Sequence, residues 1–277
     1  MKIAVISDIH GNIEALKTVL ADIESRGIDK IYCLGDILAK GQHQQECIDL
    51  LRKKCEVIIK GNCDQYYTTD YDLSKLPEED VKKIKWNRSR INDESRKYIS
   101  ELPYSYEFYM SGRLVRLLHS HPERIDKFVG NIDDFTKLYE LVLPSENTIS
   151  NKKADILIYG HIHTPFIQKI YNRYIMNPGS IGNPIDVIRN DIKDGDINNT
   201  IVANYLILTG NFDSLNVNDP ISYELVCIPY DIDKELEDNI DNVELDLYTI
   251  ELKEGRYRNM DKVYESFKKR GIDKEKI

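Results

Sequence analysis

The fold class is decided by the first twelve residues of the chain, Met1-Lys2-Ile3-Ala4-Val5-Ile6-Ser7-Asp8-Ile9-His10-Gly11-Asn12. The apolar run from Ile3 to Ile6 predicts a buried strand, which ends in a polar turn. The turn is followed by a predicted helix, whose apolar residues at helical spacing are Ile13, Leu16, Leu20 and Ile23. Gly27 marks the end of this helix. A strand followed by a turn and a helix is typical of an α/β protein.

The same unit returns twice further along the chain. A second strand at 30–34 ends in Gly35-Asp36, and a third at 56–59 ends in Gly61-Asn62, with a helix between them. This rhythm predicts parallel strands that are covered by helices. Ligands collect beyond the carboxyl ends of such strands, so we expect one sheet edge to gather Asp8, His10, Asp36 and Asn62.

The rest of the chain predicts further helices and strands. Residues 78–102 predict a pair of polar helices, which we interpret as either a solvated face or a cap over the site. The tail at 231–277 is charged and helical in pattern, and the Asp- and Asn-rich stretch 186–199 predicts a loop. A helix is expected at 132–143, and strands at 106–110, 114–118, 156–159, 166–170, 173–176, 201–208 and 223–228.

Composition excludes several classes of protein. The 277 residues include 38 basic and 47 acidic side chains, a net charge of −9. Stable binding of nucleic acid needs a basic face, so we expect no such complex. The sequence shows neither a signal segment nor a run of 18 apolar residues, so no membrane association is expected. The five cysteines form no CxxC pair, which suits free thiols and a cytoplasmic location.

Histidines mark the predicted strand ends. Five of the six lie there, namely His10, His119, His121, His161 and His163. The pattern Gly160-His161-x-His163 would arise by chance about 0.006 times in a chain of this composition, so it is a strong signal. Imidazole, carboxylate and amide ligands suit Mn, Fe or Zn rather than a soft thiolate site. The candidates outnumber the ligands of one tetrahedral ion, which predicts two ions that share a bridging carboxylate and activate a hydroxide.

The ordered motifs resemble those of the calcineurin-like metallophosphoesterases. The resemblance rests on Asp8-x-His10, Gly35-Asp36, Gly61-Asn62, His119 and Gly160-His161-x-His163. The stretches 8–12 and 177–182 resemble the bacterial phosphodiesterase branch, and residues 86–103 and the tail are similar to a subgroup with an asymmetric diadenosine-tetraphosphate hydrolase. The resemblance implies a four-layer αββα sandwich of two mixed sheets flanked by helices. We expect residues 1–230 to form this domain, with a helical cap region at 66–104, and residues 231–277 to pack on it as a helical extension.

The resemblance also implies a set of metal ligands. Asp8, His10 and His163 would hold the first ion, Asn62, His119 and His161 the second, and Asp36 would bridge them and position the hydroxide. We prefer His119 to His121 because His119 directly follows the strand at 114–118, which leaves His121 near the substrate or outside the site. We expect Mn or Fe in the site, with Zn or Ni as alternatives that the ligand types do not exclude.

Two positions depart from the family pattern. Many members carry a histidine and an aspartate that protonate the leaving group, where this chain has Cys63 and Ala39, although the neighbouring cation is present as Lys40. Without a strong general acid, which contributes about 10²–10⁴-fold, the enzyme should favour good leaving groups. Cys63 is either a weak acid or a packing residue. These features predict a phosphodiesterase that acts on phosphodiester or nucleotide polyphosphate bonds through in-line attack by the hydroxide.

Further residues are candidates for contact with the substrate. Asn62 would stabilise the added charge, and Asn12 would orient a metal ligand or a phosphate oxygen. Tyr66, Tyr67 and Tyr71 either stack on a nucleobase or pack within the protein. The expected partner is a small phosphorylated molecule, and a homodimer stays open. The alternatives are a phosphomonoesterase or protein phosphatase, and a catalytically silent binding protein on the same fold.

Overall fold

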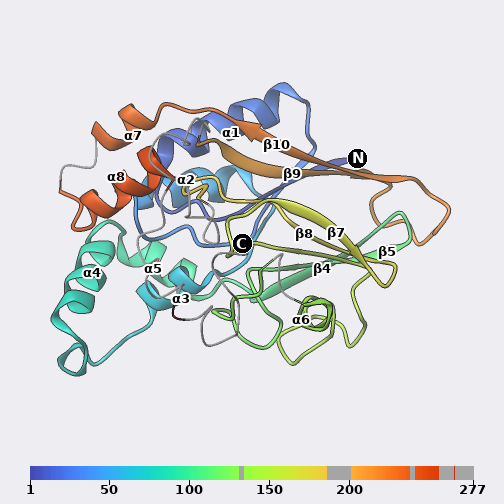
Figure 1. The fold of residues 1–277 in the computed structure, drawn as a ribbon, viewed down its shortest axis with the longest axis horizontal. Helices are drawn as coiled ribbons and strands as arrows, with labels where there is room; N and C mark the ends of the chain where they lie inside the picture. Colours follow the sequence, from blue (N-terminus) through green and yellow to red (C-terminus); the bar gives the residue numbers. More distant parts are fainter. Residues whose placement is uncertain (131–133, 186–200, 238–240, 256–264, 266–277) are drawn as a thin grey trace.

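The computed structural model describes residues 1–130, 134–185, 201–237, 241–255 and 265. Its centre is a pair of mixed five-stranded sheets with helices on their outer faces (Figure 1). The strand orders are β10-β9-β1-β2-β3 in the first sheet and β4-β5-β6-β8-β7 in the second. This arrangement confirms the predicted α/β class and the two mixed sheets flanked by helices.

The first sheet contains the three opening strands in parallel. They are β1 (Lys2–Ile6), β2 (Lys30–Cys33) and β3 (Val57–Ile58), and the register of β1 and β2 pairs Ile6 with Cys33. On the other side of β1, β9 (Ala203–Gly210) and β10 (Ile221–Ile228) continue the sheet in antiparallel fashion. Helices α1 (Ile13–Ser25) and α2 (Gln44–Lys54) connect the parallel strands, as the sequence predicts.

The second sheet supplies the other predicted strand ends. Its parallel strands are β5 (Arg113–Leu118), β6 (Ile156–Tyr159) and β8 (Arg173–Asn177). The edge strands β4 (Ser105–Met110) and β7 (Phe166–Ile170) pair with them in antiparallel fashion. The helix expected at 132–143 is shorter than predicted: α6 spans Phe135–Glu140, and residues 131–133 lie outside the described part of the chain.

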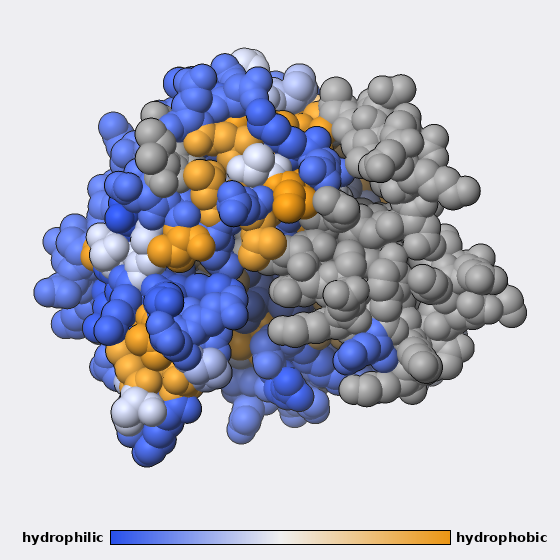
Figure 2. Space-filling model, turned by 60° about the vertical axis from the view of Figure 1, so that its left-hand side comes forward, coloured by the Kyte–Doolittle hydropathy of each residue, from blue (hydrophilic) through white to orange (hydrophobic). Residues whose placement is uncertain are grey.

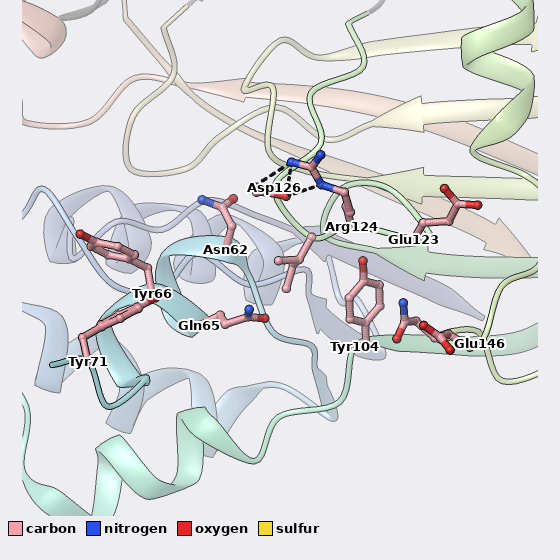
Figure 3. Close-up of a pocket in the computed structure, with 11 residues that line it drawn as sticks. Asn62, Gln65, Tyr66, Tyr71, Tyr104, Glu123, Arg124, Asp126 and Glu146 are labelled. Carbon is pink, nitrogen blue, oxygen red and sulfur yellow. Dashed lines mark hydrogen bonds and ion pairs between the residues drawn. The ribbon is translucent and has the colours of Figure 1, made fainter. Parts of the chain in front are cut away.

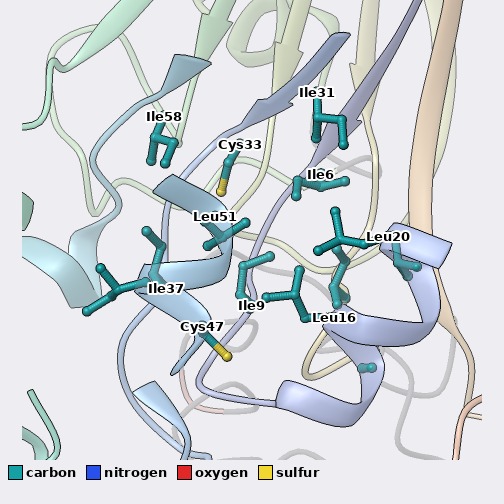
Figure 4. Close-up of a cluster of buried hydrophobic side chains, with 14 of the residues drawn as sticks. Ile6, Ile9, Leu16, Leu20, Ile31, Cys33, Ile37, Cys47, Leu51 and Ile58 are labelled. Carbon is teal, nitrogen blue, oxygen red and sulfur yellow. The ribbon is translucent and has the colours of Figure 1, made fainter. Parts of the chain in front are cut away.

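Alternate residues of β1 serve two different cores. Ile3 and Val5 pack between the two sheets, in a cluster with Val115, Leu117, Ile156 and Ile158 of the second sheet. Ala4 and Ile6 point the other way and pack with apolar residues of α1 and α2 (Figure 4). Because side chains alternate across a strand, the four buried residues of β1, Ile3–Ile6, join the helical layer to the inter-sheet layer.

The remaining helices border the carboxyl edge of the first sheet. The predicted pair at 78–102 is present as α4 (Glu78–Ser89) and α5 (Asp93–Ser100). An additional helix, α3 (Asn62–Thr68), begins directly after Gly61, followed by a 3₁₀ turn at Leu73–Lys75. In the tail, α7 (Ile232–Glu237) and α8 (Leu245–Glu254) are helical as expected. The predicted loop 186–199 and the last residues of the tail lie outside the described residues.

The outer surface combines polar and apolar side chains. On the face shown in Figure 2, the apolar groups are separated from one another by hydrophilic side chains. Within the described ranges, none of the helices is long and apolar enough to cross a bilayer.

Candidate metal centre

Hydrogen bonds between loops bring the predicted ligands together. The loop after β1 is joined to the loop after β2, because the amide of Asp8 donates to the carbonyl of Gly35 (3.0 Å) and that of His10 to Asp36 (2.9 Å). The second sheet joins them through the amide of His161, which donates to Oδ2 of Asp8 (3.0 Å). The carboxyl ends of strands from both sheets therefore meet at one edge.

Five of the predicted ligands have left-handed backbone conformations. The φ angles are 55° at Asp8, 50° at His10, 50° at Asp36, 68° at His161 and 62° at His163. Residues with a Cβ seldom adopt this region, and each such residue costs about 1–3 kcal/mol unless its surroundings hold it there. Strain of this kind is concentrated at functional sites, so the local backbone identifies the same residues as the sequence motifs.

Two motif glycines are required because there is no room for a side chain. A Cβ at Gly160 would lie 2.0 Å from Oγ of Ser7 and 2.7 Å from Oδ2 of Asp8. A Cβ at Gly61 would lie 2.1 Å from Oδ1 of Asp36. All three distances are shorter than any ordinary contact, so these glycines let the backbone pass directly behind a carboxylate.

Main-chain carbonyls orient three of the histidines. Each accepts a hydrogen bond from an imidazole Nδ1: Leu38 from His10 (3.0 Å), Leu34 from His119 (2.8 Å) and Asn183 from His163 (2.6 Å). When Nδ1 carries the proton, Nε2 presents a lone pair. An imidazole that is held in this way is typical of a metal ligand.

The Nε2 atoms of His10 and His163 lie only 3.2 Å apart. The nearest carboxylate oxygen, Oδ1 of Asp8, lies 3.4 Å from the Nε2 of His163 and 3.9 Å from that of His10. This oxygen is buried and has no hydrogen-bond partner among the described residues. Two facing lone pairs and an orphaned carboxylate oxygen repel one another unless a cation lies between them. The three side chains therefore fit a metal ion.

A second group forms around Asp36 and His119. Nε2 of His119 lies 3.4 Å from Oδ1 of Asp36 and 2.9 Å from Oδ1 of Asn62. Asp8, Asp36 and His119 also offer ligand atoms within 4.8 Å of one another. The ring of His161 lies beside that of His119, with centroids 5.3 Å apart. Asp36 lies between the two groups, since its Oδ2 is 3.8 Å from Nε2 of His10.

Burial and neighbouring charges keep several of these groups in the form that binds metal. Burial and the charge of Lys40 hold the pKa of His10 well below its ordinary range, and burial next to His119 lowers that of His161 to about 3. Burial alone would raise the pKa of Asp8, but the imidazoles, above all His163, lower it. These two imidazoles are therefore neutral and this carboxylate ionised at neutral pH, as coordination requires.

Other titratable groups shift in the opposite direction. Burial raises the pKa of Asp36, and the neighbouring Asp8 adds to this effect. Although burial opposes it, the charges of Asp36 and Asp8 raise the pKa of His119. A cation that lies against these carboxylates would reverse the first of these shifts.

The structure places three other predicted residues in detail. His121 is engaged elsewhere: its Nδ1 accepts from the amide of Glu123 (3.1 Å), and its Nε2 lies 3.0 Å from Nζ of Lys127. Asn12 is buried and caps α1, with its Oδ1 accepting from the amide of Ala15 (3.0 Å). Cys63 joins His10 and Asp36 in a third group of potential ligands. Contacts of His121 and Asn12 with substrate stay predictions.

Two supporting elements complete the centre. The turn at 177–180 braces the metal loops: Asn177 donates to the carbonyl of Gly160 (2.6 Å) and Ser180 to that of Asp8 (2.8 Å). Asp64 was not among the predicted residues, but its buried carboxylate accepts hydrogen bonds from the amides of Ile37, Leu38 and Gly61. The available signal was its spacing, because an acid three residues after a helix cap commonly reaches back to the cap amide.

An open pocket of about 530 Å³ adjoins the centre at Asn62 (Figure 3). On one side are the tyrosines of α3 and the following loop, with the rings of Tyr66 and Tyr71 5.3 Å apart. Tyr67, the third tyrosine that the sequence suggested for stacking, is instead buried in the core. The lining carries more acidic than basic groups, with Glu123, Asp126 and Glu146 against Arg124.

Residues 1–194 match the calcineurin-like phosphoesterase superfamily domain. The chain is 31% identical over 255 residues to the uncharacterized protein MJ0912 of Methanocaldococcus jannaschii, which covers 87% of this chain and 92% of that protein.

Two crystal structures share the fold over nearly the whole chain. A metallophosphoesterase from Sphaerobacter thermophilus has a TM-score of 0.65 and 22% identity, and covers 92% of this chain and 99% of its own. The hypothetical protein PH1004 from Pyrococcus horikoshii has a TM-score of 0.67 and 19% identity, with 90% and 96% covered. At these identities the likeness concerns the fold, and the bacterial branch that the sequence suggested stays a prediction.

Proposed function

The chain belongs to the calcineurin-like phosphoesterase superfamily, and from this membership we propose that it is a dimetal phosphodiesterase whose substrate carries an uncharged aromatic group, an aryl ring or a nucleobase, beside the reacting phosphate. The observation that carries the proposal is the pair of imidazole Nε2 atoms, of His10 and His163, 3.2 Å apart beside the orphaned carboxylate oxygen of Asp8. Mn²⁺ or iron is our preferred metal, because the donors are nitrogen and oxygen.

The proposed ligands fall into two groups that share Asp36. Asp8, His10 and His163 would hold one ion, and Asn62, His119 and His161 the other. Two such ions, when bound, supply Lewis acidity and an activated water for attack on phosphorus. The backbone loops hold the side chains in place before substrate arrives, so little reorganisation is needed during the reaction. The negative charge of the whole protein does not prevent phosphate binding, because the ions set the local field.

The pocket beside Asn62 supports a diester rather than a monoester. A diester has a second substituent that must lie next to the reacting phosphorus, and this pocket of about 530 Å³ offers the space. Tyr66 and Tyr71 present aromatic surface, and stacking on a base contributes about 1–3 kcal/mol. The acidic lining would repel a second phosphate in the pocket. An uncharged aromatic group therefore fits it better than a phosphate chain.

The leaving group should be one that departs without strong acid catalysis. Burial and the adjacent Asp36 raise the pKa of the Cys63 thiol well above its ordinary value, so it stays protonated but donates a proton weakly. Ala39, at the other position of the missing acid pair, has no polar side chain. We therefore favour aryl or nucleotide esters and phosphoanhydrides over alkyl esters.

The proposal is tested by measuring Mn²⁺-dependent hydrolysis of bis-p-nitrophenyl phosphate and p-nitrophenyl phosphate side by side, with Asp36→Asn as the control. We expect faster cleavage of the diester and a loss of more than about 100-fold in the variant, whose circular dichroism should match the wild type. Faster cleavage of the monoester would favour a phosphatase. If the metal-loaded protein cleaves neither compound, a silent binding protein becomes the better account.

The proposed partner of this site is a small phosphorylated molecule. We propose neither a stable nucleic-acid complex nor membrane binding, in keeping with the net charge of −9. Size-exclusion chromatography with light scattering would decide whether the chain forms a homodimer.

A further inference from the structure

Helix α8 belongs to the segment that follows the matched family domain at residues 1–194. In Figure 1 it lies between α7 and α4, on the side of the molecule that carries α2. The segment also holds α4 through Trp86, whose indole donates to the carbonyl of Asp241 (2.8 Å). The extension therefore packs against the rest of the chain.

One carboxylate of α8 is buried completely. Glu251 is 0% exposed, and its Oε2 accepts hydrogen bonds from Nζ of Lys40 (3.2 Å) and Nδ2 of Asn183 (2.7 Å). A buried carboxylate costs several kcal/mol unless it is paired and hydrogen-bonded. These contacts meet that requirement, and Asn242 adds a hydrogen bond to the carbonyl of Lys40. The extension thus contacts both the side chain and the backbone of Lys40.

Both hydrogen-bond partners of Glu251 lie next to groups that orient proposed ligands of the first ion. The carbonyl of Asn183 orients His163 by accepting from its Nδ1 (2.6 Å). Lys40 lies in the loop between β2 and α2, two residues after Leu38, whose carbonyl orients His10 (3.0 Å). This loop is strained, with φ angles of 80° at Ala39 and 66° at Lys40, so its conformation depends on contacts that hold it.

We propose that Glu251 is a positioning residue of the metal centre. Through Asn183 and Lys40 it fixes the two carbonyls that aim Nε2 of His163 and His10 at the same point. The extension would then complete the metal site of the family domain rather than only cover it. This inference rests on the proposed function for the presence of the ion, but its test needs no turnover.

The test is calorimetric titration of metal-free, full-length protein with Mn²⁺ in the absence of substrate. Outer-shell partners commonly change metal affinity by about 10–100-fold, so we expect Glu251→Gln to weaken binding about tenfold. The matched control is Glu235→Gln, since Glu235 is also 0% exposed and lies in the same extension, where it accepts from the hydroxyl of Tyr248 (3.2 Å). We expect this control to change the affinity less than twofold.

Two further variants are useful. One distinguishes the position of the carboxylate from its charge, and the other guards against a variant that does not fold. Glu251→Asp keeps the charge but shortens the side chain, and we expect weaker Mn²⁺ binding if position matters. Should Glu251→Gln fail to fold, Asn183→Ala removes one of the two donors and should weaken binding in the same direction. Wild-type affinity in Glu251→Asp, or equal losses in Glu251→Gln and Glu235→Gln, would overturn the inference. A wild-type chain that binds no Mn²⁺ would overturn the proposed function itself.

Discussion

The metal centre and the adjoining pocket share Asn62, but they are built from different kinds of structure. The centre consists of buried side chains on strained loops, and main-chain hydrogen bonds fix them from both sheets. The pocket consists of half-buried tyrosines and exposed polar side chains on α3 and the loop after β5. The proposed metal ligands are therefore held rigidly, whereas the side chains of the pocket, which would select a substrate, can be replaced without disturbing the fold.

The largest loss of activity is expected for a substitution in the metal centre, at Gly160. In Gly160→Ala the new methyl group must displace Ser7 or Asp8, so we expect the Mn²⁺-dependent activity to fall more than about 100-fold and stability to fall by about 1–3 kcal/mol. The measurements are diester hydrolysis and thermal unfolding. Gly27→Ala is the control: that glycine has a φ of 60°, which strains any side chain, but nothing lies within 4 Å of the added Cβ. Similar losses in both variants would contradict the argument from close approach.

Metal removal should affect the centre and leave the pocket unchanged. Mn²⁺ at about 100 times its Kd should stabilise the fold by about 2.7 kcal/mol per site, because it binds only the native chain. We expect the Tm to rise on adding Mn²⁺ and to return after chelation. In Asp8→Asn this rise should be lost, since that variant removes the carboxylate nearest both imidazoles. A full Mn²⁺-dependent rise in that variant would exclude Asp8 as a ligand.

A smaller effect, on KM, is expected when an aromatic side chain of the pocket is removed. Bis-p-nitrophenyl phosphate and methyl p-nitrophenyl phosphate share a leaving group and differ only in the second substituent. Loss of one stacking partner, about 1 kcal/mol, should raise KM about fivefold for the first compound in Tyr66→Leu. The second compound should show little change, as should Tyr171→Leu, which alters an exposed tyrosine outside the pocket. Equal changes on both substrates would remove the aromatic site from the proposal.

The smallest effect is expected at the missing acid pair. In Cys63→His, monoester hydrolysis should rise less than about threefold, because an unoriented imidazole is a poor general acid and Ala39 cannot orient it. The measurement is kcat/KM for p-nitrophenyl phosphate, compared with Cys63→Ser. A gain of more than tenfold would show that another group already orients the new side chain.

The strands and the ligand motifs could be predicted because their signals are local. The apolar run Ile3–Ile6 and the polar residues behind it lie within a few positions, and parallel pairing then brings Asp8 and Asp36 to one edge. The role of Glu251 could not be predicted in this way. Its partner Lys40 is 211 residues away, and no periodic pattern reports that contact.

Helix α3 was missed for a different physical reason. Its seven residues, Asn62–Thr68, include two tyrosines and one threonine and show no apolar face of helical period. Instead, the carboxylate of Asp64 accepts a hydrogen bond from the amide of Gly61 and so stabilises the start of the helix. For the same reason the sequence left open whether Tyr66 and Tyr67 pack or stack, and the structure separates them, with Tyr67 in the core and Tyr66 in the pocket.

The pairing of β1 with β9 has a consequence for protein synthesis. Lys2 lies opposite Thr209, so β1 leaves the ribosome some 200 residues before the strand β9 that it pairs with. At about 5–20 residues per second, this delay lasts roughly 10–40 s. During that time Asp8 and His10 belong to a nascent chain without a finished sheet around them. We therefore expect the proposed metal ligands to reach their final arrangement only after β9 has been translated.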